Sequence, residues 1–435
     1  MSEVDLVALV CCDLGGIVRG RSLPADELAG HMTQGVGWVP ADHSLTPLGP
    51  LAEPNPFGST GDLRLLPDAA TRVRLDQEVD PFELLLCDIV EIDGRPWECC
   101  PRRFLRETLD TVGEELGGRV RASFEHEFVL VEDGQAGLPF SLEAQRRVSP
   151  FPARVMGALQ EAGVEPERFL PEFSSHQFEI PVASAEGLAA ADRSVVLKEV
   201  VREVARREGR RASFLPLLGP EDAGNGAHIH VGLLDESGGS RLYDASAPGG
   251  LSELGGSFAA GILSHARALC ALTAPSPVSY QRLSPHHWGA GAVALAPQNR
   301  EALLRIPPLV TIASGDPAAQ MRLEYRAADA TANPYLALGG ILLAGLAGVR
   351  EGLPAPPLLE VDPATLDGEE AERFGVGALP TSLREALAAL DSDGLARGWF
   401  PDLLYDAFTS LKGAELEAVA ELDIDERCRL YGNAY

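Results

Sequence analysis

Four short segments of this chain alternate polar and apolar residues, and this alternation limits the folds that the chain can adopt. Successive side chains of a β-strand point to opposite faces, so residues at i and i+2 share a face. The four segments are residues 123–128, 176–180, 226–231 and 321–326. Each predicts a strand with one polar and one apolar face. A solvated sheet face shows the same alternation, but the paired polar positions here hold only Glu, His, Arg and Gln.

Acidic residues dominate these polar faces, together with one glutamate just upstream of the second segment. The set is Glu125, Glu127, Glu172, Glu179 and Glu324, with His228 beside it. Carboxylates a few ångströms apart raise each other's pKa, so five of them in one cavity cannot all stay ionised without cations. Oxygen ligands with one imidazole suit Mg²⁺ or Mn²⁺ better than zinc or copper. The pattern therefore predicts a site for divalent metal.

Five arginines form a second group. They are Arg282, Arg300, Arg305, Arg322 and Arg326. Guanidinium groups bind carboxylates and phosphates in a bidentate manner, and a neighbouring metal ion neutralises phosphoryl oxygens. Surface ion pairing is the alternative for each arginine, but the stretch 299–307 is otherwise mostly apolar. The two groups together favour phosphoryl transfer from a nucleotide to a carboxylate.

The order of apolar runs and turns predicts an α+β chain in two parts. Residues 1–100 are expected to form a small strand-rich domain, with a long functional loop over residues 35–68. Residues 101–435 are expected to form a larger domain of mixed strands and helices. Beyond the helix that opens at residue 101, helices are predicted near residues 152–162, 185–208, 251–271 and 334–350, and strands near residues 121–131, 172–181, 226–233 and 320–326.

Charge and composition exclude several classes of function. The chain has 36 basic and 64 acidic residues and a net charge of −28, which would repel a nucleic acid backbone. Residues 332–349 are uncharged, but Asn333, Pro334 and glycines interrupt them, so we expect a buried helix and no membrane span. The seven cysteines show no paired CxxC spacing. They and the acidic start of the chain predict reduced thiols in a cytoplasmic protein.

The motifs occur in an order that resembles the type I glutamine synthetases along the whole chain. The matching segments are residues 125–128, 177–179, 224–230, 299–300, 324–326 and 332–336. The resemblance implies an N-terminal β-grasp domain, then a catalytic domain built as an antiparallel sheet funnel with helices. It also implies rings of six subunits, usually stacked as a dodecamer, with each site between neighbouring subunits.

The resemblance also implies roles for individual residues. Two Mg²⁺ or Mn²⁺ ions per site would be held by Glu127, Glu172 and Glu179 and by Glu125, His228 and Glu324. ATP would contact Glu167, His230, Arg300, Arg305 and Arg322, and glutamate would contact Gly224, Arg282 and Arg326. Arg300 would stabilise the phosphoryl group during transfer. In such a reaction ATP phosphorylates the glutamate side chain, and ammonia captures the acyl phosphate.

The chain departs from the resemblance where ammonium would bind. The family flap carries a glutamate that accepts a proton from ammonium, whereas Trp288 stands at this place, preceded by His286 and His287. The ammonium-binding loop of the first domain is missing too, and Asp42 is a candidate substitute. His286 or His287 would then take the proton, because imidazole titrates near neutrality. Trp288 would stack on an alkyl or aromatic amine or contact a second ammonium group.

These departures predict an ATP-dependent ligase that joins the γ-carboxylate of glutamate to an amine larger than ammonia, such as a polyamine, ethanolamine or a monoamine. Two alternatives remain open. One is a true glutamine synthetase with an unusual flap, and the other is an inactive ring with a structural or regulatory role. The inactive ring predicts lost metal ligands, and the sequence keeps all six.

Several polar residues outside these motifs have simpler interpretations. Asp192 and Lys198 lie at polar positions of the helix predicted over residues 185–208 and are expected to be solvated. His265 is expected to be a core or capping histidine. No partner can be assigned to His43 from the sequence.

Overall fold

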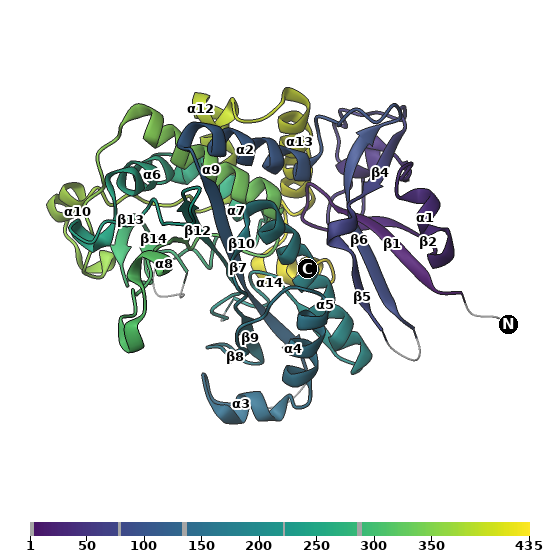
Figure 1. Cartoon of the computed structure of the whole chain (residues 1–435), viewed down its shortest axis with the longest axis horizontal. Coiled ribbons are helices and arrows are strands. Elements are labelled where there is room, and N and C mark those ends of the chain that lie inside the picture. Colours follow the sequence, from purple (N-terminus) through teal and green to yellow (C-terminus); the bar gives the residue numbers. More distant parts are fainter. Residues whose placement is uncertain (1–3, 77–79, 133–136, 221, 285–288) are drawn as a thin grey trace.

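The computed structural model describes residues 4–76, 80–132, 137–220, 222–284 and 289–435. Figure 1 shows the first sheet on one side of the molecule and a larger part, with a second sheet and most of the helices, on the other. Among the described residues, no helix has the length and apolar character that crossing a lipid bilayer requires. The α+β fold class that the sequence predicts is confirmed.

The first sheet has six strands in the order β2-β1-β6-β4-β3, and β5 pairs with β6. The strands are β1 (Leu6–Cys12), β2 (Val18–Pro24), β3 (Val36–Trp38), β4 (Leu63–Pro67), β5 (Val73–Leu75) and β6 (Phe82–Glu91). β1 and β6 are parallel, and the other pairs are antiparallel. The short helix α1 (Leu28–His31) follows β2.

The prediction of one long loop over residues 35–68 is wrong at its two ends. β3 and β4 pair there in antiparallel fashion, and β4 also pairs with β6, where Leu65 lies opposite Ile89. β4 buries every second residue, from Leu63 through Leu65 to Pro67. This alternation covers only five residues between Gly- and Pro-rich flanks, so it is too short to stand out in the sequence.

The second sheet has nine strands, with β7 at its centre. The order is β13-β14-β15-β12-β7-β9-β8, and β10 and β11 also pair with β7. The strands are β7 (Arg119–Val131), β8 (Leu170–Pro171), β9 (Gln177–Ile180), β10 (Ala185–Glu186), β11 (Arg211–Ser213), β12 (Ala227–Leu234), β13 (Ala292–Pro297), β14 (Ala302–Ile306) and β15 (Leu323–Tyr325). Of the strand expected over residues 172–181, only β9 forms within that range, and β8 lies just before it.

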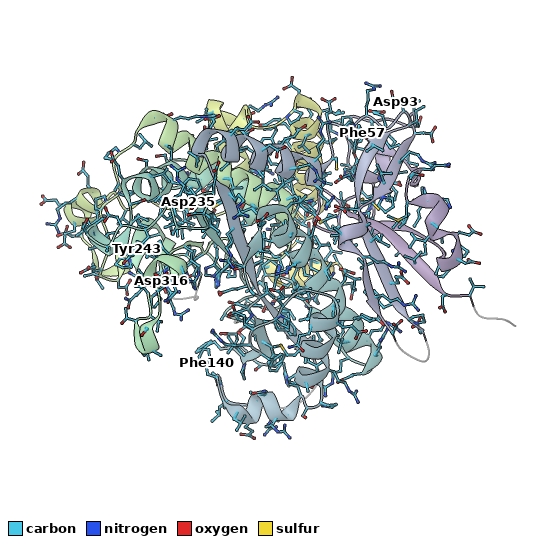
Figure 2. The ribbon with its side chains drawn as sticks, in the orientation of Figure 1. Phe57, Asp93, Phe140, Asp235, Tyr243 and Asp316 are labelled. Atoms are coloured by element: carbon cyan, nitrogen blue, oxygen red, sulfur yellow. The ribbon has the colours of Figure 1, made fainter. Side chains whose placement is uncertain are left out.

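Helices cover one face of this sheet and fill the rest of the larger part. They are α2 (Pro101–Leu116), α3 (Leu142–Arg147), α4 (Phe151–Glu161), α5 (Gly187–Arg207), α6 (Glu253–Ser264), α7 (Ala266–Thr273), α8 (Pro317–Gln320), α9 (Pro334–Glu351), α10 (Gly368–Phe374), α11 (Leu383–Ser392), α12 (Gly394–Arg397), α13 (Asp402–Ala418) and α14 (Ile424–Tyr431). α5 packs against β7, and α9 packs against α6 and α2. In Figure 2 Phe140, before α3, and Asp316, before α8, lie on the lower left of the molecule, and Phe57 and Asp93 of the first-sheet region lie at the upper right.

The helix expected over residues 251–271 is two helices. α6 ends at Ser264 and α7 begins at Ala266, because His265 leaves the helical conformation with φ −103° and ψ 13°. His265 is the C-cap residue of α6, as the sequence predicts, and its backbone N–H donates to the Gly261 carbonyl. Its ring also hydrogen-bonds to Asp393. Helix α9 is buried on nearly all sides, which agrees with the buried helix expected over residues 332–349.

Asp192 and Lys198 correct a second prediction, because both are buried on the inner side of α5. Asp192 accepts hydrogen bonds from Arg102 and from the Tyr335 hydroxyl. The Lys198 ammonium group donates to the carbonyl of Ala330 at 2.9 Å. The helix therefore presents charged residues to the protein interior, and each is satisfied by a partner from a distant part of the chain.

Candidate active site

The strand register places the predicted acidic residues side by side on one face of the second sheet. Glu125 of β7 lies opposite His228 of β12. Glu127 lies opposite Glu179 of β9. Glu324 of β15 lies between β12 and β14 and faces a histidine and an arginine on these strands. Directly opposite residues of an antiparallel pair have Cβ atoms about 4.5–5.5 Å apart, so these side chains are neighbours on the sheet.

One cluster combines two carboxylates with imidazole nitrogens. Ligand atoms of Glu125, His230 and Glu324 lie within 4.8 Å of one another, and His230 Nε2 is 3.0 Å from Glu125 Oε1. The predicted set has His228 in place of His230, and His228 Nδ1 lies 3.8 Å from Glu125 Oε2 and 4.0 Å from Glu324 Oε1. The buried Nε2 atom of His228 has no hydrogen-bond partner within the described residues. These donors fit a divalent cation.

Two arginines hold Glu324 in its charged form. Arg305 Nη1 donates to Glu324 Oε2 at 2.6 Å, and Arg326 Nη1 donates to the other oxygen. Burial by itself raises the pKa of this carboxyl. Electrostatic interactions with Arg326, His230, His228 and Arg305 outweigh burial and lower the pKa of Glu324 to about 2. Glu324 is therefore an anion throughout the ordinary pH range.

A second cluster consists of three carboxylates, Glu127, Glu172 and Glu179. Burial and then the charge of Glu127 raise the pKa of Glu172 to about 7. Burial and the charges of Glu125, Glu127 and Glu172 raise the pKa of Glu179 well above its usual range. The three groups repel one another as anions, which is the electrostatic situation that a bound divalent cation relieves. The cluster thus fits an oxygen-ligated Mg²⁺ or Mn²⁺ ion.

Gln177 orients Glu127, although the sequence assigned it no role beyond its place on the same strand face as Glu179. Its amide nitrogen donates to Glu127 Oε2 at 3.2 Å and to the Gly224 carbonyl at 2.7 Å. The backbone N–H of Gly226 donates to the same carboxylate oxygen at 2.8 Å. The segment around Gly224 is therefore tied directly to the three-carboxylate cluster.

The residues predicted to bind glutamate lie beside these clusters. Arg282 and Arg326 are almost fully buried. Arg282 donates to the Ala328 carbonyl at 2.7 Å, and its buried Nε has no partner within the described ranges. Gly224 has φ +86°, and a Cβ there would lie 2.5 Å from the Pro216 carbonyl oxygen, so this position requires glycine.

Gly226 marks the point where the predicted metal and glutamate groups meet. A Cβ at this position would lie 3.1 Å from His228 Nε2, 3.3 Å from Arg282 Nη1 and 3.5 Å from Glu127 Oε1. The Arg300 backbone joins the same region, because its carbonyl accepts from Arg326 Nε at 2.9 Å.

A cavity of about 380 Å³ opens beside Glu125 and brings together three of the residues predicted to contact ATP, namely Glu167, His230 and Arg322. Arg322 Nε donates to His230 Nδ1 at 3.0 Å. Arg305 instead lies beside Glu324 and does not line this cavity. A larger cavity of about 970 Å³ lies between the first sheet, α2 and α5 and contains none of the predicted site residues.

Two further arginines, which no sequence motif indicated, line the 380 Å³ cavity. They are Arg121 and Arg168. The signal for Arg121 was present, because the i, i+2 rule places it on the same face of β7 as Glu125. The predicted flap residues His286, His287 and Trp288 lie outside the described residues. Asp42 lies in a short 3-10 helix, Pro40–Ser44, which packs against α13.

Known proteins resemble this chain over its full length. Residues 98–429 match the model of the glutamine synthetase catalytic domain, and residues 1–97 match that of the glutamine synthetase N-terminal domain. A gamma-glutamylpolyamine synthetase of Streptomyces coelicolor is 35% identical over 96% of this chain and 91% of its own length. A glutamate–isopropylamine ligase of a Pseudomonas species is 28% identical over 95% and 92%. Several relatives at 29–30% identity are named glutamine synthetase.

A crystal structure described as a novel glutamine synthase homolog superposes with a TM-score of 0.93, at 43% identity over 100% of this chain and 99% of that chain. These matches confirm the predicted ATP-dependent carboxylate–amine ligase. The family models cover nearly the whole sequence, and this chain belongs to the glutamine synthetase family.

Proposed function

We propose that this enzyme uses ATP to join the γ-carboxylate of glutamate to an amine larger than ammonia. The observation that carries this proposal is the combination of a complete acidic and basic site with Trp288 at the place of the flap glutamate. Relatives named for polyamine and isopropylamine substrates support the same amine class. The chain retains the carboxylates and arginines that would activate glutamate. The flap glutamate that would take a proton from ammonium is replaced by Trp288.

The buried arginines Arg282 and Arg326 would bind the α-carboxylate of glutamate, because a guanidinium group pairs with a carboxylate through two parallel hydrogen bonds. The two carboxylate clusters would hold two divalent cations, Mg²⁺ or Mn²⁺, which neutralise charge on the phosphoryl oxygens when bound. Arg305 and Arg322 would contact the nucleotide phosphates, and Arg300 the phosphoryl group during transfer.

The reaction would proceed in two steps. A γ-carboxylate oxygen of glutamate attacks the terminal phosphorus of ATP, which forms γ-glutamyl phosphate and releases ADP. The amine nitrogen then attacks the acyl carbon, phosphate leaves, and the nitrogen loses a proton. We assign this proton to His287 or His286, because the flap has no carboxylate and a neutral imidazole is a suitable base. Trp288 would contact the alkyl part of the amine.

The amine class is tested by measuring glutamate-dependent phosphate release with ammonia, ethanolamine, putrescine, spermidine and a monoalkylamine. We expect the highest kcat/KM with one of the larger amines. The variant Trp288→Glu restores the carboxylate of the family flap, so it is expected to gain activity with ammonia and lose it with the preferred amine. Highest turnover with ammonia in the unmodified enzyme would contradict the proposal.

Ammonia is the second candidate substrate, because several relatives of similar length are named glutamine synthetase. The same amine series separates the two candidates. An inactive ring is disfavoured by the retained ligand set. We also propose that the enzyme assembles as a hexameric ring or a dodecamer and acts in the cytoplasm, where its seven buried free cysteines would remain reduced.

A further inference from the structure

Three residues form a row across the second sheet at the outer end of the 380 Å³ cavity. Arg121 of β7 lies opposite Gly232 of β12. Val231 lies opposite Leu323 of β15, and continuing this register by one residue places Arg322 beside the other side of Gly232. Arg121, Gly232 and Arg322 all line the cavity. A residue without a side chain is thus flanked by two arginines.

Gly232 leaves an open floor between the two arginines. Because the side-chain period of a strand is two, Gly232 occupies the same face as His230. A Cβ built on Gly232 would lie 4.0 Å from the Cβ of Arg121 and would meet nothing closer than 3.7 Å. The backbone therefore does not demand glycine here, and a larger residue would project into the cavity beside Arg121.

The charges around this floor favour an anion. The cavity is lined by three arginines, Arg121, Arg168 and Arg322, and by two carboxylates, Glu125 and Glu167, and Glu167 pairs with Arg168 at 3.7 Å. The carboxylate nearest in register to Arg121 is Glu186, and it pairs with Arg119 instead. Arg121 is exposed and has no ion-pair partner in the part of the chain that the structure describes. Arg322 is anchored through His230 and the Gln320 carbonyl. Two guanidinium groups on either side of an exposed backbone can donate charge-assisted hydrogen bonds to a phosphate group. They do so although the protein as a whole has a net charge of −28.

We propose that Arg121 and Arg322 clamp a phosphoryl group of the nucleotide that is not transferred, seated over Gly232. This inference rests on the proposed function, because it assigns the cavity to ATP. Arg121 lies four residues along β7 from Glu125, or roughly 13 Å between Cα atoms at 3.3 Å per residue. This separation places the clamp away from the metal-binding carboxylates and toward the nucleoside end of the triphosphate.

The test is binding of ADP and of adenosine by calorimetry in the presence of Mg²⁺. Arg121→Gln is expected to raise the dissociation constant for ADP roughly tenfold, since hydrogen bonds to charged groups contribute about 1.5–3 kcal/mol, and to leave adenosine binding unchanged. Arg119→Gln is the matched control, because Arg119 lies two residues earlier on the same strand and pairs with Glu186. It is expected to bind ADP like the unmodified enzyme.

Gly232→Val is a second variant that removes the seat and keeps both charges. It is expected to weaken ADP binding at least as much as Arg121→Gln does. Equal ADP affinity in the Arg121→Gln variant and the unmodified enzyme would overturn the clamp, and so would an equal loss of ADP and adenosine binding. If the unmodified enzyme itself bound no ADP, the proposed function would fail, and this outcome is distinguishable because it does not depend on any variant.

Discussion

His43 shows how much a single residue depends on its surroundings. It is fully buried, and neither ring nitrogen has a hydrogen-bond partner among the described residues. Its ring packs edge-on against Trp97, with 5.2 Å between the ring centroids. Burial, and then the charge of Arg19, lower the pKa of His43 to about 3. The neutral imidazole is therefore the form that the folded protein accommodates.

Acid should destabilise the protein through His43. Its pKa in the folded state lies below the unfolded value of about 6.5, so the unfolded chain binds the proton more readily between these values. The stabilising effect of the neutral ring is complete above pH 6.5. It falls by about 1.4 kcal/mol for each pH unit below 6.5. Urea unfolding at pH 7, 6 and 5 measures this loss.

The variant His43→Phe keeps an aromatic contact with Trp97 and removes the titrating group. We expect its free energy of unfolding to fall less between pH 7 and pH 5 than that of the unmodified protein. Parallel curves for the two proteins would show that His43 does not contribute to acid sensitivity.

At the scale of elements, α6 and α9 approach through glycines. A Cβ on Gly261 of α6 would lie 2.1 Å from the Ala344 carbonyl oxygen, and a Cβ on Gly348 of α9 would lie 2.2 Å from the Ser257 carbonyl oxygen. Each glycine thus permits backbone contact with the partner helix. The hydrophobic pattern of residues 334–350 predicts a buried helix, but it does not show which helix packs against it.

The substitution Gly261→Ala should therefore destabilise the protein. Alanine is favoured over glycine in a helix by about 1 kcal/mol, but the new methyl group meets rigid backbone, and such overpacking costs about 1–3 kcal/mol or more. Gly157 of α4 is the control, because a Cβ there meets no atom within 4 Å. Gly157→Ala should stabilise by up to about 1 kcal/mol. Thermal unfolding of both variants checks the opposite signs, and stabilisation by Gly261→Ala would contradict the close contact.

At the scale of the whole molecule, Arg102 joins the first sheet to the larger part. This buried residue at the start of α2 donates to Asp68 at 2.7 Å and to Asp88 at 2.9 Å, both from the first-sheet region. It also forms two bonds of 2.9 Å with Asp192 of α5. One guanidinium group thus satisfies carboxylates from three separate parts of the chain.

Replacement of Arg102 by Met should destabilise the folded protein by about 3–5 kcal/mol, because it leaves the buried Asp192 without its counter-charge. Arg103→Met removes the neighbouring arginine, whose pair with Glu107 is exposed on the helix surface, and should cost less than about 1 kcal/mol. Urea unfolding of the two variants tests the difference. Similar losses of unfolding free energy for both variants would show that the bonds of Arg102 between the two parts do not contribute more to stability than an exposed ion pair does.

The sequence by itself determined the chemistry of the site and most of the elements around it. Glu125 and Glu127 share one face of their strand, and so do His228 and His230, because the side chains of a strand repeat every two residues. This period is a local property of the chain. Long segments with a clear period, such as α5 and α9, were predicted for the same reason. Family membership followed from the order of motifs along the chain.

Only the tertiary structure decided which of these groups meet. Strand register places His230 as well as His228 beside Glu125 and Glu324, and it brings Arg121 and Arg322 to the two sides of Gly232. Burial of Asp192 and Lys198 depends on Arg102 and on the Ala330 carbonyl, which lie far away in the sequence. A local pattern cannot encode such partners, because register and burial depend on contacts between residues that are distant along the chain.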